Sequence, residues 1–405
     1  MIRFLRSERA LEIHATSPIN IALVKYWGKL DEEYIIPLNS SLSITVDQND
    51  LCSRTLVKLV YDQDMNDLSE PKVTLILNGK SEKITHRIMN VINTIRKRAQ
   101  NVKAYDVEGS AEDNNQQYID IPKEDLLKMR IEVTSDNNFA TASGLASSSS
   151  GLSCLSFAIA QLYGVQEQFE GEYSTFARLG SGSACRSIYG GFVQWHAGFE
   201  SMADMITQEM QDISQKSIAK PIKLSEQSLN FWLDNLELVI CCVKPEKNSS
   251  LQKDVPSTDG MRISHQTSDL MKLKLEQGLS EIHIEKLTQA LENRDLNTAY
   301  EIIMKESNQL HAICLDSYPP IFYMNETSKN IIKQCTNLNK QAKNDEQIQS
   351  NIVAYSIDAG FHVFLFMLKD HKERVMDAIK ADDSVMEGIE RFIETRIGRE
   401  GVKLH

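Results

Sequence analysis

The chain has 405 residues, of which 41% are hydrophobic and 25% are charged, and its formal net charge is −12 at pH 7. This composition is typical of a soluble globular protein with two or three domains, and we expect two. Because an acidic chain is poorly suited to nucleic acid or to an anionic membrane surface, we expect neither as a partner, and any basic cluster should serve a small anionic ligand.

Residues 1–198 are predicted to form an N-terminal domain of strands and helices. Strands and turns are expected over 13–60, a strand with an Asn78-Gly79 turn over 72–80, and a helix over 81–99. A polar surface loop is predicted over 100–120 and a short strand over 130–135. Apolar residues at helical spacing (Leu152, Leu155, Ile159 and Leu162) predict a helix directly after the run GLASSSSG at 144–151.

Residues 199–405 are predicted to form a second domain. A strand is expected over 236–243, and helices over 261–278, 280–292, 295–314 and 319–338. Two strands should flank Ala359-Gly360, followed by a final helix over 370–395. Since strands and helices mix without strict βαβ alternation, the predicted fold class is α+β.

The cysteines and the hydropathy of the chain predict its redox environment and whether it spans a membrane. The seven cysteines are scattered and odd in number, which indicates reduced thiols and a cytoplasmic location. No apolar run approaches 18 residues, so no membrane span is expected.

The serine-rich run at 144–151 is a candidate phosphate site. A glycine- and serine-rich loop that opens a helix presents free backbone N–H groups at the positive end of the helix dipole. The run is not a Walker A loop, because no Gly-Lys-Ser/Thr follows at the required spacing. A flexible loop or an ordinary serine-rich helix cap is the alternative interpretation.

Six stretches in this order resemble the GHMP kinase superfamily, and within it the ATP-dependent decarboxylases that act on mevalonate 5-diphosphate. They are SPINIALVKYWGKLDEEYIIPLNSSLS (17–43), NNFATASGLASSSSG (137–151), ARLGSGSACRSIYGGFVQW (177–195), STDGM (257–261), SNQLHAICLDSYPPIFYMN (307–325) and AYSIDAG (354–360). The resemblance implies an N-terminal ATP-loop domain, a C-terminal ferredoxin-like domain and an active site in the cleft between them. It also implies ATP and Mg²⁺ as cofactors, release of CO₂ and phosphate to give isopentenyl diphosphate for isoprenoid and sterol biosynthesis, and a homodimer.

Site residues follow from the same resemblance. Asp316 is expected to accept or orient the proton of the substrate's 3-hydroxyl, although an isolated Asp beside Pro319-Pro320 is ordinarily a solvated acid. Arg186 is expected to hold the departing carboxylate through its planar guanidinium, and Lys25 to stabilise developing charge. Substrate contacts are expected at Tyr26, Trp27, Gly28, Lys29, Ser181, Gly182, Ser183, Ala184, Cys185, Arg186 and Thr258. ATP contacts are expected at Asn137, Gly144, Leu145, Ala146, Ser147 and Ser148, with Ser148 also reaching Mg²⁺ through ATP.

The chain leaves the family pattern at three places. Ala140 stands where the family has proline, and Phe361-His362 stand where it has Pro-Asn. Phe361 is either a core anchor or a wall of the cleft, and His362 either approaches the diphosphate or is a hydrogen-bonded structural histidine. A substrate-contacting arginine that the family has at the start of the first helix has no clear counterpart, and Lys83, His86 and Arg87 are the candidates to substitute for it. Diphosphate selection is not readable from spacing, so a kinase or decarboxylase for a differently phosphorylated mevalonate, or a binding protein without catalysis, stays open.

Overall fold

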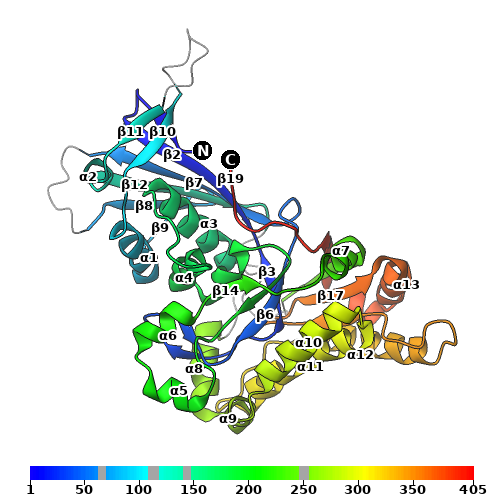
Figure 1. The fold of residues 1–405 in the computed structure, drawn as a ribbon. Coiled ribbons are helices and arrows are strands. Elements are labelled where there is room, and N and C mark those ends of the chain that lie inside the picture. The colour runs from blue at the N-terminus through cyan, green and yellow to red at the C-terminus, as the bar shows by residue number, and fades with distance from the viewer. Residues whose placement is uncertain (63–69, 108–117, 140–146, 246–254) are drawn as a thin grey trace.

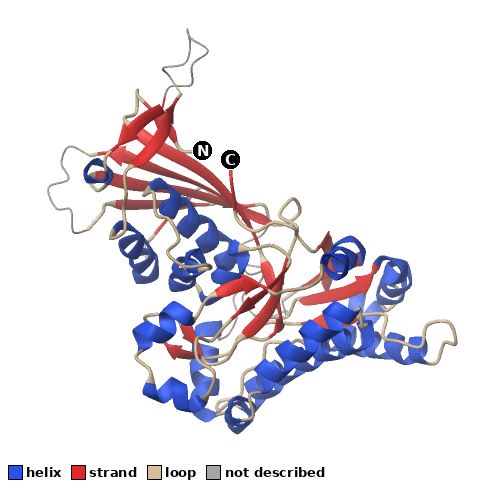
Figure 2. Ribbon diagram, in the orientation of Figure 1, coloured by secondary structure: helices blue, strands red, loops and turns tan. Residues whose placement is uncertain are grey.

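The computed structural model describes residues 1–62, 70–107, 118–139, 147–245 and 255–405. Strands and helices form two main bodies of structure, one from each half of the chain (Figures 1 and 2). The predicted α+β class is confirmed by the mixture of mainly antiparallel sheets and packed helices. Within the described residues, no helix combines the length and apolar character that a membrane crossing requires.

The N-terminal body is built on a nine-stranded sheet in the order β11-β10-β1-β2-β7-β12-β8-β9, with β19 added beside β2. Its strands are β1 (Arg3–Leu5), β2 (Ala10–Pro18), β7 (Cys52–Tyr61), β8 (Val73–Leu77), β9 (Lys80–Glu82), β10 (Val102–Asp106), β11 (Tyr118–Ile121), β12 (Met129–Asn137) and β19 (Lys403–Leu404). Alternate residues of β2, such as Leu11 and Ile13, are buried against the helices. The helices α1 (His86–Arg96), α3 (Ser147–Leu162) and α4 (Glu172–Gly180) lie together on one face of this sheet (Figure 1).

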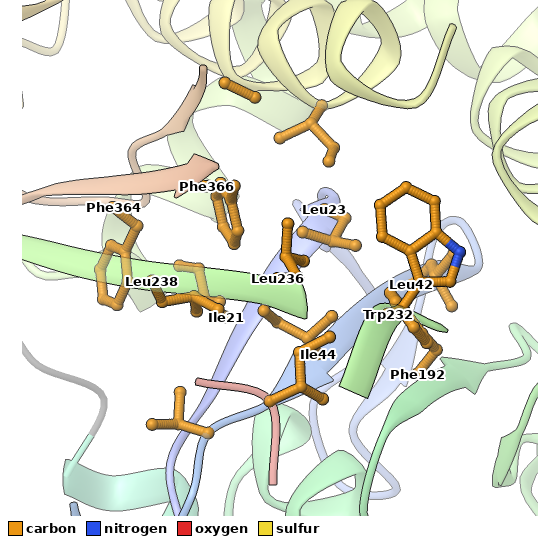
Figure 3. Close-up of a cluster of buried hydrophobic side chains, with 14 of the residues drawn as sticks. Ile21, Leu23, Leu42, Ile44, Phe192, Trp232, Leu236, Leu238, Phe364 and Phe366 are labelled. Carbon is orange, nitrogen blue, oxygen red and sulfur yellow. The ribbon is translucent and has the colours of Figure 1, made fainter. Parts of the chain in front are cut away.

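A second sheet joins the two bodies. It has the order β14-β13-β6-β3, from β3 (Asn20–Val24), β6 (Ser41–Thr45), β13 (Phe192–Trp195) and β14 (Ala219–Pro221). Apolar side chains of β3 and β6, including Ile21 and Ile44, share one core with Leu238 and Phe366 of the C-terminal sheet (Figure 3). This shared core holds the loop after β3 against the C-terminal helices.

The C-terminal sheet has the order β16-β17-β15-β18, from β15 (Leu236–Val243), β16 (Ala354–Ser356), β17 (Val363–Leu368) and β18 (Ile389–Arg396). Successive residues of β15 alternate between two cores: Val239 and Cys241 belong to one, and Leu238 and Ile240 to the other. A strand buried on both faces has no polar face, which explains why LELVICCV is apolar at every position except the partly buried Glu237.

The remaining elements are mostly helices and short strands around the cleft and the C-terminal sheet. They are β4 (Lys29–Asp31), β5 (Ile36–Pro37), α2 (Lys123–Leu126), η1 (Gly182–Ile188), α5 (Met202–Thr207), α6 (Met210–Lys216), α7 (Glu226–Asn235), α8 (Ser257–Thr267), α9 (Asp269–Glu276), α10 (Leu279–Asn293), α11 (Leu296–Asp316), α12 (Glu326–Lys343), α13 (Lys369–Lys380) and α14 (Asp383–Met386).

The predicted boundary between domains at residue 198 stays a prediction. Strand β14 lies beyond that boundary and pairs with β13, which lies before it.

Three predicted elements were wrong. The loop expected over 100–120 contains β10 and β11, which pair with each other as the outer strands of the large sheet. The helix expected over 370–395 ends at Lys380, and its last part is β18, which pairs along β15. The helix expected from 319 begins at Glu326, because prolines 319 and 320 do not continue a helix and the Asn325 side chain accepts the Ser328 N–H at the start of α12.

Candidate active site

A cleft of about 190 Å³ lies between the two halves of the chain. The N-terminal half contributes residues of β3 and the loop after it, α1, α3 and η1, and the C-terminal half contributes residues of α8, α11 and the loop after β16. Among the described lining residues, Lys25, Lys29, Arg87 and Arg186 are cationic, and Asp358 is acidic. A larger open cavity beside β2 and β19 contains none of the predicted site residues, so the cleft is the better candidate. Its charge suits a small polyanion.

Lys25 and Asp358 form an ion pair at the floor of this cleft. Lys25 Nζ lies 2.5 Å from Asp358 Oδ1, and it also donates to Ser356 Oγ at 2.6 Å and to the carbonyl oxygen of Ala22 at 2.9 Å. Burial lowers the pKa of Lys25, and the neighbouring Asp358 carboxylate opposes this shift. The Lys25 side chain is only 3% exposed, whereas that of Asp358 is 43% exposed. The ammonium group is therefore fixed in place, and the carboxylate remains accessible to a ligand.

Arg186 is a buried cation held by neutral partners. Its Nε donates to Asn20 Oδ1 at 3.2 Å and its Nη1 donates to Ser41 Oγ at 2.9 Å. Its guanidinium carbon lies 5.8 Å from the centre of the Trp195 ring. Burial lowers the pKa of Arg186. Because these hydrogen-bond acceptors carry no charge, the guanidinium is available to bind an anion that enters the cleft.

The KYWGK segment places two aromatic side chains on the cleft wall. Tyr26 packs on Trp195 with ring centres 4.7 Å apart, and Trp27 meets the Tyr323 ring edge-on at 6.0 Å. Among the described residues, neither Tyr26 Oη nor Trp27 Nε1 has a hydrogen-bond partner. Buried polar atoms usually have partners, so these two atoms are candidates to bond a ligand. Gly28 does not line the cleft, but its φ of +98° and the close approach of Met271 and Leu38 explain why no side chain stands there.

Two cations lie at the mouth of the cleft and share one carboxylate. Glu32 Oε2 accepts from Lys29 Nζ at 2.7 Å and from Arg87 Nη2 at 3.2 Å. Of the three residues considered as replacements for the family's arginine, Arg87 is the one that lines the cleft, and Lys83 and His86 are not among its lining residues. Lys29 and Arg87 are therefore positioned to receive a second anionic group of a ligand.

Small polar residues line two further walls. Ser181, Gly182 and Ser183 line the cleft from the start of η1, and Thr258 lines it from α8. A side chain at Gly182 would approach Tyr26 Oη and Trp195 to 2.9 Å, so close packing requires glycine there.

The two residues after Ser183 do not line the cleft. Ala184 and Cys185 are fully buried behind it. Burial raises the pKa of Cys185 to about 12, and its Sγ lies 2.9 Å from the Gly182 carbonyl oxygen. Cys185 is therefore a packed thiol, and direct substrate contact is not supported for either residue.

The predicted ATP loop lies partly outside the described residues. The residues outside the described ranges are Ala140, Gly144, Leu145 and Ala146. Ser147 is the first residue of α3. Ser148, in the first turn of α3, lines the cleft. The Asn137 side chain accepts from Ser53 Oγ at 2.5 Å and does not line the cleft. Of the predicted ATP residues that are described, Ser148 is thus the one that connects the serine-rich loop to the cleft.

The role predicted for Asp316 stays a prediction, and its carboxylate is hydrogen-bonded to residues at the start of α9. Asp316 is the last residue of α11, and its Oδ2 accepts from Ser268 Oγ at 2.7 Å and from the backbone N–H of Leu270 at 3.0 Å. The Leu270 N–H and the Ser268 hydroxyl lower the pKa of this carboxyl. These bonds direct the carboxylate to the first turn of α9, and Asp316 is not a lining residue of the cleft. The turn before Pro319 is held to α8, because Ser317 bonds Ser264 and the Tyr318 N–H donates to Thr267.

The Phe361-His362 pair also lies outside the cleft. Phe361 packs against the core formed by α12, α13 and the C-terminal sheet, in agreement with the core interpretation. His362 is buried, and its Nδ1 accepts from the backbone N–H of Val243 at 3.1 Å. This bond favours the structural interpretation of His362 over contact with a diphosphate.

The sequence did not predict Asp358, the carboxylate among the described lining residues of the cleft. Asp358 lies in the segment AYSIDAG, for which the sequence predicted no site residue. Asp358 comes directly after the short buried strand β16, where the chain leaves the sheet. An acid at the end of a buried strand is a usable signal, because such positions open onto the edge of a sheet. Other lining residues that were missed are Asn20, Ala22, Ser257, Met261, Leu310 and Ala359.

Comparison with known proteins connects this cleft to one family. A model described as "Diphosphomevalonate decarboxylase-like N-terminal domain" matches residues 17–207, and one described as "Mevalonate 5-diphosphate decarboxylase C-terminal domain" matches residues 239–402. The diphosphomevalonate decarboxylase of Danio rerio is 36% identical and covers 91% of this chain and 79% of its own. That of Candida albicans is 34% identical, with 95% of each chain covered.

Solved structures agree with these relatives. A crystal structure of mevalonate 5-diphosphate decarboxylase superposes with a TM-score of 0.75 at 30% identity and covers 97% of both chains. A structure described as "MDDEF in complex with MVAPP, AMPPCP and Magnesium" superposes with a TM-score of 0.72 at 27% identity, covering 98% of this chain and 99% of its own. The two family models match both halves of the chain and the structures superpose over nearly its full length, so the chain belongs to the mevalonate 5-diphosphate decarboxylase family, with the GHMP kinase fold.

Proposed function

We propose that this protein catalyses the ATP-dependent decarboxylation of mevalonate 5-diphosphate to isopentenyl diphosphate, releasing ADP, phosphate and CO₂. The observation that carries the proposal is the Lys25–Asp358 pair, which lies with Arg186 in a cationic cleft next to Ser148. A hydroxyl, a carboxylate and a diphosphate are the three groups of this substrate that need recognition. The cleft offers a separate partner for each.

The two ends of the substrate are assigned to opposite ends of the cleft. Lys29 and Arg87 at the mouth suit the diphosphate, because two cations there share the single carboxylate of Glu32. Arg186 at the floor suits the C1 carboxylate, since a planar guanidinium can donate two parallel hydrogen bonds to it. Ser181, Ser183, Thr258 and Tyr26 supply neutral donors along the walls.

Phosphorylation of the 3-hydroxyl is assigned to Asp358 and Lys25. Asp358 accepts or orients the hydroxyl proton as the oxygen attacks the γ-phosphorus of ATP. The adjacent Lys25 ammonium, held by three acceptors, stabilises the negative charge that develops on the transferring oxygens. Asp316, which is not among the described lining residues, is the alternative acid for this role.

The carboxylate is then released from the phosphorylated intermediate. The bond between C1 and C2 breaks, its electron pair forms the double bond between C2 and C3, and phosphate leaves C3 with the electron pair of its bond. Arg186 holds the carboxylate in the orientation that this step needs. Since burial separates Arg186 from bulk water, its interaction with the carboxylate is stronger than at a surface site.

ATP and Mg²⁺ are assigned to the start of α3. Support comes from the position of Ser148 on the cleft and from the similar structure described with AMPPCP and magnesium. A hydroxyl in the first helical turn is a suitable ligand for phosphate or for phosphate-bound Mg²⁺. When bound, Mg²⁺ neutralises charge on the β- and γ-phosphates during transfer.

We also propose a cytoplasmic homodimer that serves isoprenoid and sterol biosynthesis. The seven cysteines are free thiols at buried positions, which supports a reducing compartment. The dimer is supported only by the resemblance to the family. Light scattering of the purified protein at several concentrations tests it, and a constant monomer mass would contradict it.

The activity is tested by measuring CO₂ release with ATP and Mg²⁺ from mevalonate, mevalonate 5-phosphate and mevalonate 5-diphosphate in parallel. We expect release from the diphosphate alone, with one ADP and one phosphate per CO₂. ADP without CO₂ would indicate a kinase, and release mainly from the monophosphate would indicate the other decarboxylase specificity. Binding without either product would indicate a protein that has lost catalysis.

A further inference from the structure

The side of Lys25 away from the cleft contacts a fully buried glutamate. Glu306 Oε2, on α11, accepts the backbone N–H of Lys25 at 3.0 Å. Its carboxylate also accepts from Lys274 Nζ on α9, at 2.8 and 2.9 Å, and lies 2.5 Å from His283 Nδ1 on α10. The Glu306 side chain is 0% exposed. Three helices of the C-terminal half therefore meet at one carboxylate, which also bonds the loop after β3. These helices, α9, α10 and α11, are labelled in Figure 1.

We propose that Glu306 is a positioning residue for Lys25: it fixes the Lys25 backbone and keeps a negative charge beside the cationic floor of the cleft. The proposal rests on the function proposed for Lys25 above. A structural role alone explains it poorly, because a buried ion pair adds little net stability compared with apolar residues of the same volume. The carboxylate is also directed at the amide of a residue whose side chain contacts Asp358.

The charge of Glu306 acts on Lys25 in a definite direction. Burial lowers the pKa of Lys25, while the charges of Asp358 and Glu306 raise it and that of Arg186 lowers it. The neighbouring His311 is itself buried, and burial together with the charge of Lys25 lowers its pKa to about 4, so it adds no positive charge at neutral pH. The groups that face Glu306 are Lys274, His283 and the Lys25 amide. Removing the negative charge should therefore make the Lys25 ammonium easier to deprotonate.

The test uses Glu306→Gln, which keeps the shape and an acceptor oxygen but removes the charge. We expect kcat to fall about tenfold with an unchanged KM for ATP, because a misplaced Lys25 affects the transition state more than nucleotide binding. We also expect the alkaline limb of the pH profile of kcat/KM to move to lower pH by about one unit. A lost structural contact alone would not move this limb.

Two further variants make the test specific. Lys274→Met removes a positive charge from Glu306, so it should move the alkaline limb to higher pH, and this opposite shift can be measured even if Glu306→Gln does not fold. Glu172→Gln is the matched control: Glu172 is also buried, accepts a backbone N–H from Gln168 and pairs with Arg98, but it lies on α4, away from the cleft. Its profile should match the wild type.

The outcomes separate this proposal from the proposed function. Wild-type turnover in Lys25→Met would overturn the role of Lys25 itself. If Lys25→Met is inactive but Glu306→Gln and Lys274→Met both keep the wild-type alkaline limb, the positioning role of Glu306 is overturned and the function stands.

Discussion

The floor and the mouth of the cleft use positive charge in different ways. At the floor, Lys25 and Arg186 are buried, and their side chains donate several hydrogen bonds to acceptors of the surrounding chain. At the mouth, Lys29 and Arg87 share Glu32; the Lys29 side chain is 5% exposed, whereas those of Arg87 and Glu32 are 38% and 57% exposed. A buried charge acts strongly on its neighbours, whereas an exposed one is screened by water and salt. The floor is therefore suited to the reacting groups, and the mouth to capture of the diphosphate.

The largest expected effect is at Lys25. Lys25→Met should lower kcat about 10²- to 10³-fold, with ATP still bound, because a fixed cation at the reacting centre acts mainly on the transition state. In the wild type, activity should fall as pH rises through the lowered pKa of Lys25, since only the protonated side chain carries the charge. Steady-state kinetics from pH 6 to 10 checks both points, and the residual activity of the variant should lack this alkaline limb.

Arg186→Lys should have the next largest effect. It keeps a positive charge but loses the planar arrangement of donors, so we expect kcat/KM to fall about 10- to 100-fold. Arg374→Lys is the control, because Arg374 pairs with Asp345 on the surface of the protein. Similar, small losses at both positions would contradict carboxylate binding by Arg186.

A smaller effect, of opposite sign, is expected at the mouth. Glu32→Gln removes the carboxylate that pairs with Lys29 and Arg87. The KM for mevalonate 5-diphosphate should therefore fall about 2- to 5-fold, with kcat unchanged. Added salt should weaken this gain, since exposed charges are screened. A raised KM would show that Glu32 orders the two cations and does not compete with the substrate.

The smallest kinetic effect is expected at His362. Because its Nδ1 accepts the Val243 N–H outside the cleft, His362→Asn should leave the dependence of substrate KM on pH unchanged between pH 6 and about 7.5. The free energy of unfolding should fall by about 1 kcal/mol through the altered buried hydrogen bond. A changed KM profile without a change in stability would restore the diphosphate-binding interpretation.

Local patterns predicted much of the fold because they reflect local physics. The largely apolar strand at 236–243 and the hairpin at Asn78-Gly79 were both predicted, since burial on two faces and positive φ are visible in the sequence. The strand at 389–396 was missed because its pairing with β15, about 150 residues earlier, outweighs a helix-like local pattern.

The sequence predicted those parts of the candidate site in which several lining residues come from one short segment. KYWGK and GSGSACR each bring neighbouring residues to the cleft, so a match to the segment finds most of them. Asp316 and Asp358 could not be separated in this way, because both are acids next to a turn. Which of them faces the cleft depends on how α9 packs on α11, and a sequence motif does not contain that information.

The central claim is that Asp358, and not Asp316, acts on the substrate hydroxyl, and comparing Asp358→Asn with Asp316→Asn tests it most directly. Both changes remove one carboxylate charge, and single-turnover formation of ADP with saturating mevalonate 5-diphosphate reports the transfer step. We predict that Asp358→Asn slows this step about 10²- to 10⁴-fold, while Asp316→Asn, once shown to be folded, stays close to the wild-type rate. A normal rate in Asp358→Asn together with a large loss in Asp316→Asn would contradict the account.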